Sequence, residues 1–237
     1  MSTIKGAIRL SLHVASVNIH NRECWQCQHL CGIILIVNQN KPYHHGDLRG
    51  ALLQASLELL RHPASGDFTL REVARRAGVS HNAPYRHFRD KDDLLAAIAE
   101  QGFERLTAAI QSAAGKGQTP FEQLQSAGIA YIEFAQAQPE HFSVMFSIDL
   151  KENRHVSAKA AAEKCFAELV KLVAASRQVQ SPRSVPPETA ALVAWTQVHG
   201  IAVLALRGQL RFRSRREIKE FAKLATEAIG RGLRLTN

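Results

Sequence analysis

Apolar residues recur every three or four positions through most of the chain after about residue 42, and this is the period of an amphipathic helix. No convincing run alternates β-branched and polar residues, so the sequence predicts no strands. Gly, Pro and polar clusters interrupt the helical period and mark the turns. The pattern therefore predicts an all-α protein, with helices over about 48–61, 70–77, 81–87, 92–114, 121–137, 139–147, 156–176, 189–206 and 217–233.

The second and third predicted helices form a recognisable pair. Thr69 and Glu72 are spaced so that each side chain reaches the backbone N–H of the other, which predicts a capping box. Gly78 favours a left-handed turn after residues 70–77, and Ser80 is placed to cap the polar segment that follows. Two short helices joined by such a turn, the second rich in hydrogen-bonding groups, predict a helix-turn-helix that reads the major groove of DNA.

This region resembles the DNA-binding signature of the tetracycline-repressor (TetR) family of bacterial regulators. The family pattern recurs at Ala77 to Ser80, Tyr85, His87, Phe88, Lys91 and Leu94. Pro84 departs from it, because the family more often has Leu there. Proline has no backbone donor and is tolerated only in the first turn of a helix, so the reading helix is expected to start late. The resemblance implies a three-helix DNA-binding domain followed by a larger helical domain that binds a ligand and dimerises.

The resemblance and the side-chain chemistry together give the candidate DNA-binding residues. Arg can bond guanine in two places and Asn can do so with adenine, so Arg86 and Asn82 are the expected specifiers. In the symmetric pair that the resemblance implies, two such reading helices would lie roughly 34–36 Å apart on operator DNA. The phosphate contacts are predicted at Thr69, Tyr85, His87 and Lys91, and the contacts nearest the base edges at Ser80, His81, Asn82 and Arg86, with Ala83 among them.

The C-terminal part concentrates aromatic residues, and two interpretations of them stay open. The ordinary role of a buried aromatic is core packing, but a lining rich in Met and Phe also suits an apolar ligand cavity between helices. Trp195, His199 and Gly200 look like the Trp-His-Gly signature of one branch of the family, although a histidine such as His199 is more often a satisfied buried histidine than a ligand or a base. The candidate ligand-binding residues are Phe103, Tyr131, Phe134, Phe142, Met145, Phe146, Phe166, Trp195 and His199.

The predicted organisation has three parts: a poorly ordered extension over 1–42, the DNA-binding domain over 43–91, and the ligand-binding and dimerisation domain over 92–237. Cys24, Cys27 and Cys31 have spacing that suits a zinc or iron–sulfur site, yet no fourth cysteine lies nearby. No metal and no cofactor are therefore predicted, and a zinc protein built on these cysteines is one alternative.

Composition narrows the function further. The formal charge of +9 and the pI near 9.7 permit a polyanionic partner but do not require one. The sequence shows no secretion signal and no apolar run of about 20 charge-free residues early in the chain, so a cytoplasmic location without membrane insertion is expected. A helical enzyme using His199 with Glu163 or Glu133 is a second alternative, but no nucleophile–base pairing or phosphate-binding loop supports it.

The preferred hypothesis is a homodimeric, ligand-responsive transcriptional regulator and not an enzyme. Its partners would be double-stranded operator DNA, a small and largely apolar effector, and a second copy bound through the last two helices. The effector would favour a spacing of the reading helices that misfits the operator, with helix 92–114 as the lever, and so would release a repressor from DNA.

Overall fold

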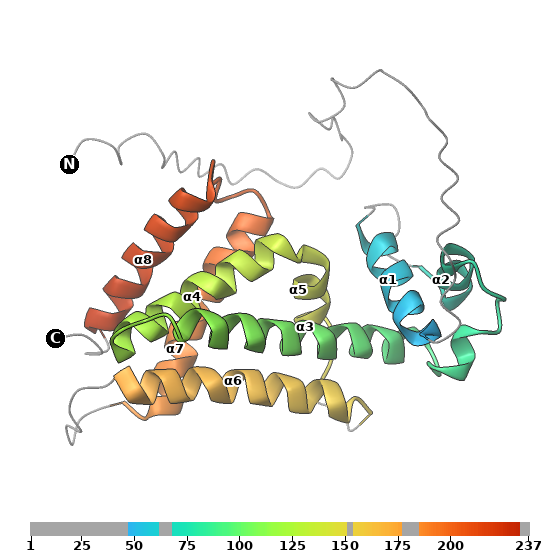
Figure 1. The fold of residues 1–237 in the computed structure, drawn as a ribbon, viewed down its shortest axis with the longest axis horizontal. Helices are drawn as coiled ribbons and strands as arrows, with labels where there is room; N and C mark the ends of the chain where they lie inside the picture. The colour runs from blue at the N-terminus through green and yellow to red at the C-terminus, as the bar shows by residue number, and fades with distance from the viewer. Residues whose placement is uncertain (1–46, 62–67, 151–153, 177–184, 233–237) are drawn as a thin grey trace, which may run out of the picture. The chain divides into compact units, whose positions relative to one another are not determined.

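The computed structural model describes residues 47–61, 68–150, 154–176 and 185–232, which all belong to one compact unit beginning at residue 44 (Figure 1). Every regular element within these ranges is helical, which confirms the all-α prediction. The extension over 1–42, with Cys24, Cys27 and Cys31, lies outside the described residues. The helices are α1 (Leu48–Leu60), α2 (Leu70–Ala77), η2 (Pro84–Arg86), α3 (Lys91–Ala114), α4 (Pro120–Ala137), α5 (Pro139–Met145), α6 (Val156–Ser176), α7 (Pro187–Leu206) and α8 (Arg215–Gly232).

Local capping fixes the start of α2 as predicted. The Thr69 hydroxyl accepts a hydrogen bond from the N–H of Glu72 at 3.3 Å, and the Glu72 carboxylate accepts one from the N–H of Thr69 at 2.7 Å. Gly78 ends the helix at φ +71°, a left-handed conformation that costs glycine little. The apolar stripe of α2 is buried at Leu70 and Val73, while its arginines face solvent.

The reading segment is shorter than predicted. Residues 81–83 form a turn, and only Pro84–Arg86 are helical, as a single 3₁₀ turn. Pro84 cannot donate to the carbonyl of Ser80, so the α-helical ladder cannot begin there. The backbone instead forms tighter i to i−3 bonds, from Ala83 to Ser80 at 2.9 Å and from His87 to Pro84 at 2.9 Å. The expected helix over 81–87 is therefore wrong in its extent, although its late start is confirmed.

Helix α3 connects the helix-turn-helix to the remaining helices (Figure 1). Asp90 caps it by accepting from the N–H of Asp93 at 3.0 Å, and the apolar face that includes Leu94, Ile98 and Leu106 is buried. At Gly102 α3 lies close against α5, because a Cβ added there would lie 2.5 Å from the Met145 sulfur. A side chain at position 102 would have to displace Met145, so the sequence uses glycine.

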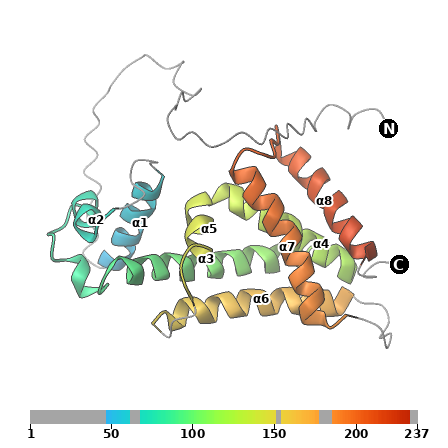
Figure 2. The ribbon, with the colours of Figure 1, turned by 180° about the vertical axis from the view of Figure 1, so that it is seen from behind.

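Helices α3, α4, α6 and α7 pack around a shared core, with α8 lying against α4 (Figures 1 and 2). A second capping box, between Thr119 and Glu122, starts α4. Ile132 on α4 and Val173 on α6 are fully buried in this core. The predicted bounds of these helices agree with the structure to within about two residues.

Helix α7 is apolar on nearly all sides, as its sequence indicated, and by length and composition it is the one described helix that could cross a membrane. Here it packs on α4 and α6 and buries Ala191, Ile201 and Ala202. Two of its apolar residues, Leu192 and Leu204, are exposed at 46% and 41%. The residues that the structure describes therefore leave part of these apolar side chains uncovered.

Candidate DNA-binding surface and ligand cavity

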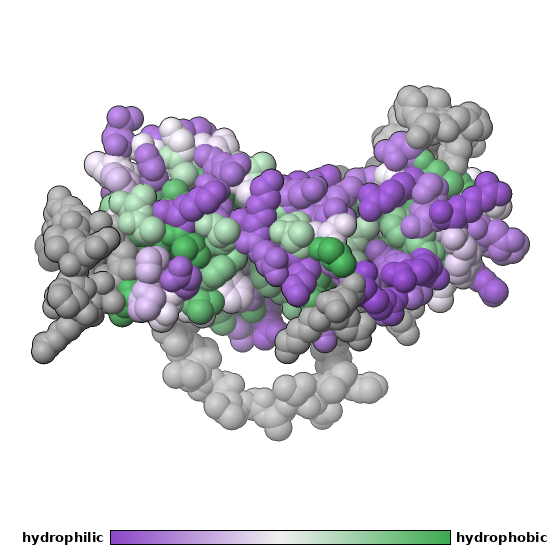
Figure 3. Space-filling model, turned by 90° about the horizontal axis from the view of Figure 1, so that it is seen from below, coloured by the Kyte–Doolittle hydropathy of each residue, from purple (hydrophilic) through white to green (hydrophobic). Residues whose placement is uncertain are grey.

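The candidate DNA-binding residues lie together on the outside of the helix-turn-helix. Tyr85 is 51% exposed, and Ala83 and Lys91 are half-buried. Beneath the segment Pro84 and Phe88 are buried and attach it to the core. In Figure 3 hydrophilic side chains cover much of the right-hand end, which carries α1 and α2. The remaining candidates, all exposed, are Thr69, Ser80, His81, Asn82, Arg86 and His87.

The charged side chains around this surface differ in whether they already have a partner within the protein. Arg89 is held by Asp93 through bonds of 2.6 and 2.9 Å, and its hydrogen bonds hold the pKa of the Asp93 carboxyl below its ordinary value. Lys91 lies over the Phe68 ring at 4.8 Å, a cation–π contact that positions its ammonium at the start of α3. The Arg86 side chain, by contrast, forms no hydrogen bond or ion pair with any described residue. Arg86 is therefore available to a partner.

The hydroxyl of Thr69, which is predicted to contact a phosphate, is already hydrogen-bonded within the chain. This hydroxyl both accepts from the Glu72 N–H and donates to the Glu72 carboxylate at 3.1 Å. A phosphate that accepted from this hydroxyl would have to replace the second bond. The sequence located Thr69 at the surface but did not indicate this competition.

A cavity of about 720 Å³ lies among α3, α4, α6, α7 and the segment after α5. Its volume is within the range of natural small-molecule pockets, roughly 300–1,000 Å³. Six of the predicted ligand-binding residues line it, namely Phe103, Tyr131, Met145, Phe146, Phe166 and Trp195. The sequence analysis did not single out the other lining residues, which include Leu106, Ile110, Ile148, Leu150, Lys159, Cys165, Leu169, Leu192 and Val198.

Three predicted ligand-binding residues do not line this cavity. Phe134 and Phe142 are buried at 5% and 2% exposure, pack in the core and are not among the residues that line this cavity. Their part in ligand binding stays a prediction. His199 lies behind the wall, stacked on Phe142 at 5.5 Å and edge-on to Phe146 at 4.6 Å. Helical spacing alone could not separate these residues from their neighbours, because the packing of other helices decides which side chain borders the empty volume.

Three side chains distant in sequence form a hydrogen-bonded chain at the cavity wall. The indole N–H of Trp195 donates to the Tyr131 hydroxyl at 3.1 Å, and that oxygen lies 2.8 Å from Nδ1 of His199. Indole can only donate, so the Tyr131 hydroxyl hydrogen is free to go to His199, whose Nδ1 then accepts. Burial raises the pKa of Tyr131 and lowers that of His199, which keeps both groups neutral.

This chain of bonds argues against the enzymatic alternative. His199 bonds a phenol, and within the described ranges no carboxylate bonds to it. Glu133 instead lies 3.9 Å from Lys219, and Glu163 is exposed on the cavity wall. The described residues also contain no cluster of three His, Cys, Asp or Glu side chains suited to a metal.

Acidification is expected to destabilise the fold through two histidines. Burial lowers the pKa of both His199 and His141 from 6.5; for His141 the positive charge of Arg105 lowers it further, while Glu140 acts in the opposite direction. Between the folded and unfolded pKa values the unfolded chain binds more protons, so the free energy of unfolding falls as pH decreases through about 6.5. Each group contributes at most about 1.4 kcal/mol per pH unit.

Urea unfolding between pH 5.5 and 7.5 measures this effect. His199→Asn offers Tyr131 an acceptor oxygen but cannot titrate, so its stability should depend less steeply on pH than that of the wild type. Equal slopes for the two proteins would show that His199 is not the titrating group.

The geometry is that of a helix-turn-helix protein whose reading segment is attached to a cavity-containing helical bundle. The chain belongs to the tetR family of bacterial regulatory proteins. The family profile of that description matches residues 52–98, and the profile described as a tetracyclin repressor-like C-terminal domain matches residues 124–229. These matches confirm the predicted membership of the TetR family. The Trp-His-Gly signature stays a prediction.

Known relatives agree with this assignment. An HTH-type transcriptional activator, FasR of Mycolicibacterium smegmatis, is 25% identical over 138 residues, which span 57% of this chain and 63% of the relative, slightly less than two thirds of its length. A structure of a protein of unknown function from Rhodococcus sp. RHA1 is 34% identical with a TM-score of 0.68, covering 81% of this chain and 98% of that one. The fatty acid degradation regulator FadR of Bacillus halodurans shares the fold at 13% identity and a TM-score of 0.63, over 78% of this chain and 96% of that one.

Proposed function

We propose that the chain is a homodimeric, ligand-responsive DNA-binding regulator that acts as a repressor. The observation that carries this proposal is the reading segment itself. Its polar residues 80–82 and 85–87 face solvent, while Pro84 and Phe88 hold the backbone from below. A core segment would bury such groups, and a free loop would not be attached by two buried rings. An exposed, preorganised set of donors suits the major groove.

We assign the DNA contacts to individual residues as the sequence predicted. Thr69, Tyr85, His87 and Lys91 hold phosphates and set the register, while Ser80, His81, Asn82, Ala83 and Arg86 meet the base edges. The domain division at residue 91 also remains part of the proposal. In the cytoplasm, where we place the protein, the family's regulators meet chromosomal DNA.

The dimer interface is proposed on the outer faces of α7 and α8. Leu204 is 41% exposed on α7 and Leu224 is 58% exposed on α8. Exposed apolar residues on adjacent helices are costly in water and usually mark a contact surface. Burying them against a twofold mate would bring two reading segments onto one face of the duplex.

The effector site is the 720 Å³ cavity, lined by Phe103, Tyr131, Met145, Phe146, Phe166 and Trp195, with His199 supporting the wall from behind. Two helices connect it to the DNA-binding surface. Helix α3 borders the cavity with Phe103 and Leu106 and continues to the reading segment. Met145, the last residue of α5, also borders it.

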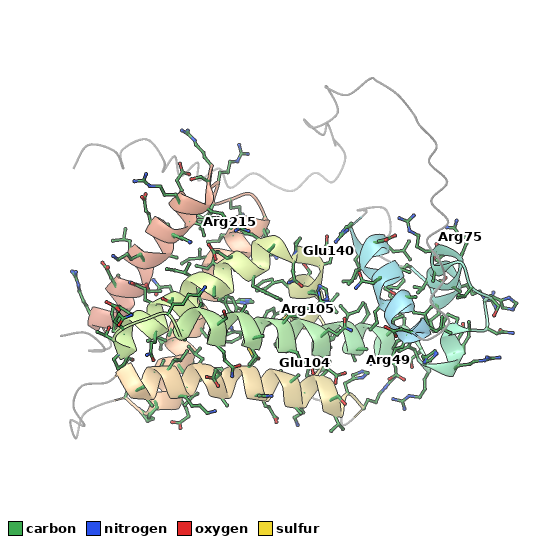
Figure 4. The ribbon with its side chains drawn as sticks, in the orientation of Figure 1. Arg49, Arg75, Glu104, Arg105, Glu140 and Arg215 are labelled. Carbon is green, nitrogen blue, oxygen red and sulfur yellow. The ribbon has the colours of Figure 1, made fainter. Side chains whose placement is uncertain are left out.

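Helix α5 contacts α1 as well. Its Glu140 accepts a hydrogen bond from Arg61 Nε at 3.1 Å, and Figure 4 shows Glu140 on the side of α5 that faces α1. An effector that displaces Met145 would move α5, and the ion pair transmits that movement to α1. Because an equilibrium shifts only when the effector binds the two forms unequally, the cavity must differ between them.

Selection of genomic or random DNA fragments by the purified protein, followed by fluorescence anisotropy titration of the selected sequence, tests the function. We expect sequence-selective binding by a dimer that weakens steeply with salt. Transcription in vitro from a promoter containing the site determines the sign of regulation. Absence of sequence-selective binding at any salt concentration would reject the proposal.

A further inference from the structure

The polar groups on the cavity wall are unequally available to a ligand. Trp195 donates its N–H to Tyr131, and the Tyr131 hydroxyl is paired with His199 at 2.8 Å. Cys165 is buried, and burial raises the pKa of its thiol, so it stays neutral. Around Tyr131 on α4, Cys165 on α6 and Trp195 on α7, the wall therefore offers a ligand mainly apolar and aromatic surface.

Lys159 is the exception. It lines the cavity from the first turn of α6, is half-buried, and has no ion pair or side-chain hydrogen bond with any residue the structure describes. The other charged lining residues, Asp149 and Glu163, are exposed, and Asp149 has an interaction of its own. Water screens those two carboxylates more effectively than it screens the ammonium of Lys159.

The ammonium of Lys159 is partly shielded from water at the edge of an apolar cavity, and it therefore favours a ligand that carries an anionic group. The pairing of ammonium and carboxylate is stronger there than in open water. The N-terminal end of a helix adds a partial positive charge of the same sign. Figures 1 and 2 both show α7 crossing the C-terminal half of α6, away from this first turn. Along α6 itself, Lys159 precedes the apolar lining residues Phe166 and Leu169 by about two to three turns.

We infer that the cavity binds an amphipathic carboxylate, whose head group pairs with Lys159 and whose apolar body extends along Phe166 and Leu169 toward Trp195. This inference rests on the proposed effector site and names the chemistry of its ligand. Lys159 is a ligand-binding residue that selects the charge of the head group, while the aromatic wall selects the apolar body.

Three probes with one chain length test the charge requirement: dodecanoate, dodecanol and dodecyltrimethylammonium, each titrated into the full chain by isothermal calorimetry below its micellar concentration. We expect dodecanoate to bind about tenfold or more tightly than dodecanol, the effect of one hydrogen bond to a charged group. In Lys159→Met, dodecanoate should fall to the affinity of dodecanol, and dodecanol should be unaffected.

Lys171→Met is the matched control, because Lys171 lies on the same helix, is exposed and pairs with Glu168 at 3.5 Å. It should leave both affinities unchanged. Thermal melting verifies that each variant is folded, and Lys159→Gln provides a second uncharged side chain if the Met variant is not. Equal binding of dodecanoate and dodecanol, or tighter binding of the ammonium probe, would overturn the inference.

Operator binding of the same preparations separates the two proposals. A protein that binds its selected DNA but none of a carboxylate series from octanoate to hexadecanoate would retain the proposed function and lose this inference. A protein that binds dodecanoate through Lys159 but selects no DNA would retain the inference and lose the proposed function.

Discussion

Arg86→Ala should nearly abolish operator recognition while leaving the fold intact. The Arg86 side chain is exposed and has no bond to any other described side chain, so its removal costs the folded state little. A good two-point contact from Arg to guanine is worth about 1–3 kcal/mol in discrimination. A dimer loses two such contacts, so affinity should fall by about 30-fold to more than 10,000-fold.

Anisotropy titration at several salt concentrations measures the loss of operator affinity and shows whether Arg86 contacts a base or a phosphate. If Arg86 reads a base, the loss should be large on the operator and small on unrelated DNA. If it contacts a phosphate, binding to both DNAs should weaken, and the salt slope of the dimer should fall by about two, one for each protomer. Arg86→Lys retains the charge but not the planar fork, so it should also lose specificity. Unaltered operator affinity in Arg86→Ala would remove this residue from the interface.

Arg215→Ala is the matched control for this experiment. Arg215 is an exposed arginine at the start of α8, and Figure 4 shows it far from Arg75 on α2. Its removal takes away the same charge without touching the helix-turn-helix. Operator affinity should therefore remain within about twofold of the wild type, because distant surface charges are largely screened.

Leu224→Asp should convert the dimer into monomers. Leu224 is 58% exposed in the single chain, and the proposed twofold would bury it in the interface. An uncompensated charge in such an interface costs about 3–5 kcal/mol, which weakens association by more than a hundredfold. Operator binding should fall with it, because a monomer contacts only half of the site. Sedimentation velocity over a concentration series measures the first effect, and anisotropy the second.

Val156→Asp is the control for Leu224→Asp, because it introduces the same charge at an exposed apolar residue outside the proposed interface. Val156 is 66% exposed but lies at the start of α6, where an acidic residue in the first turn favours the helix. It should leave the oligomeric state unchanged. A Leu224→Asp protein that sediments as the wild-type dimer would place the interface elsewhere, and Leu204→Asp would then show whether α7 alone forms it.

The sequence by itself determined the features that depend on neighbouring residues. The capping box at Thr69 and the turn at Gly78 act over three or four positions, and the apolar stripe of α3 repeats at helical spacing. The helix bounds could therefore be predicted closely, and only the consequence of Pro84 was underestimated. The signature at 77–94 sufficed to predict the family and the surface location of the reading residues.

Only the tertiary structure decided which side chains meet across the core. Tyr131, Trp195 and His199 are 64 to 68 positions apart in their contacts, and nothing local in the sequence pairs them. Tyr131 and Phe134 lie one turn apart on α4, yet only the first borders the cavity. Lys159 has the sequence context of any solvated lysine. The physical reason is that a cavity is the volume left between several packed helices, and the period of a single helix specifies which face is buried but not what that face encloses.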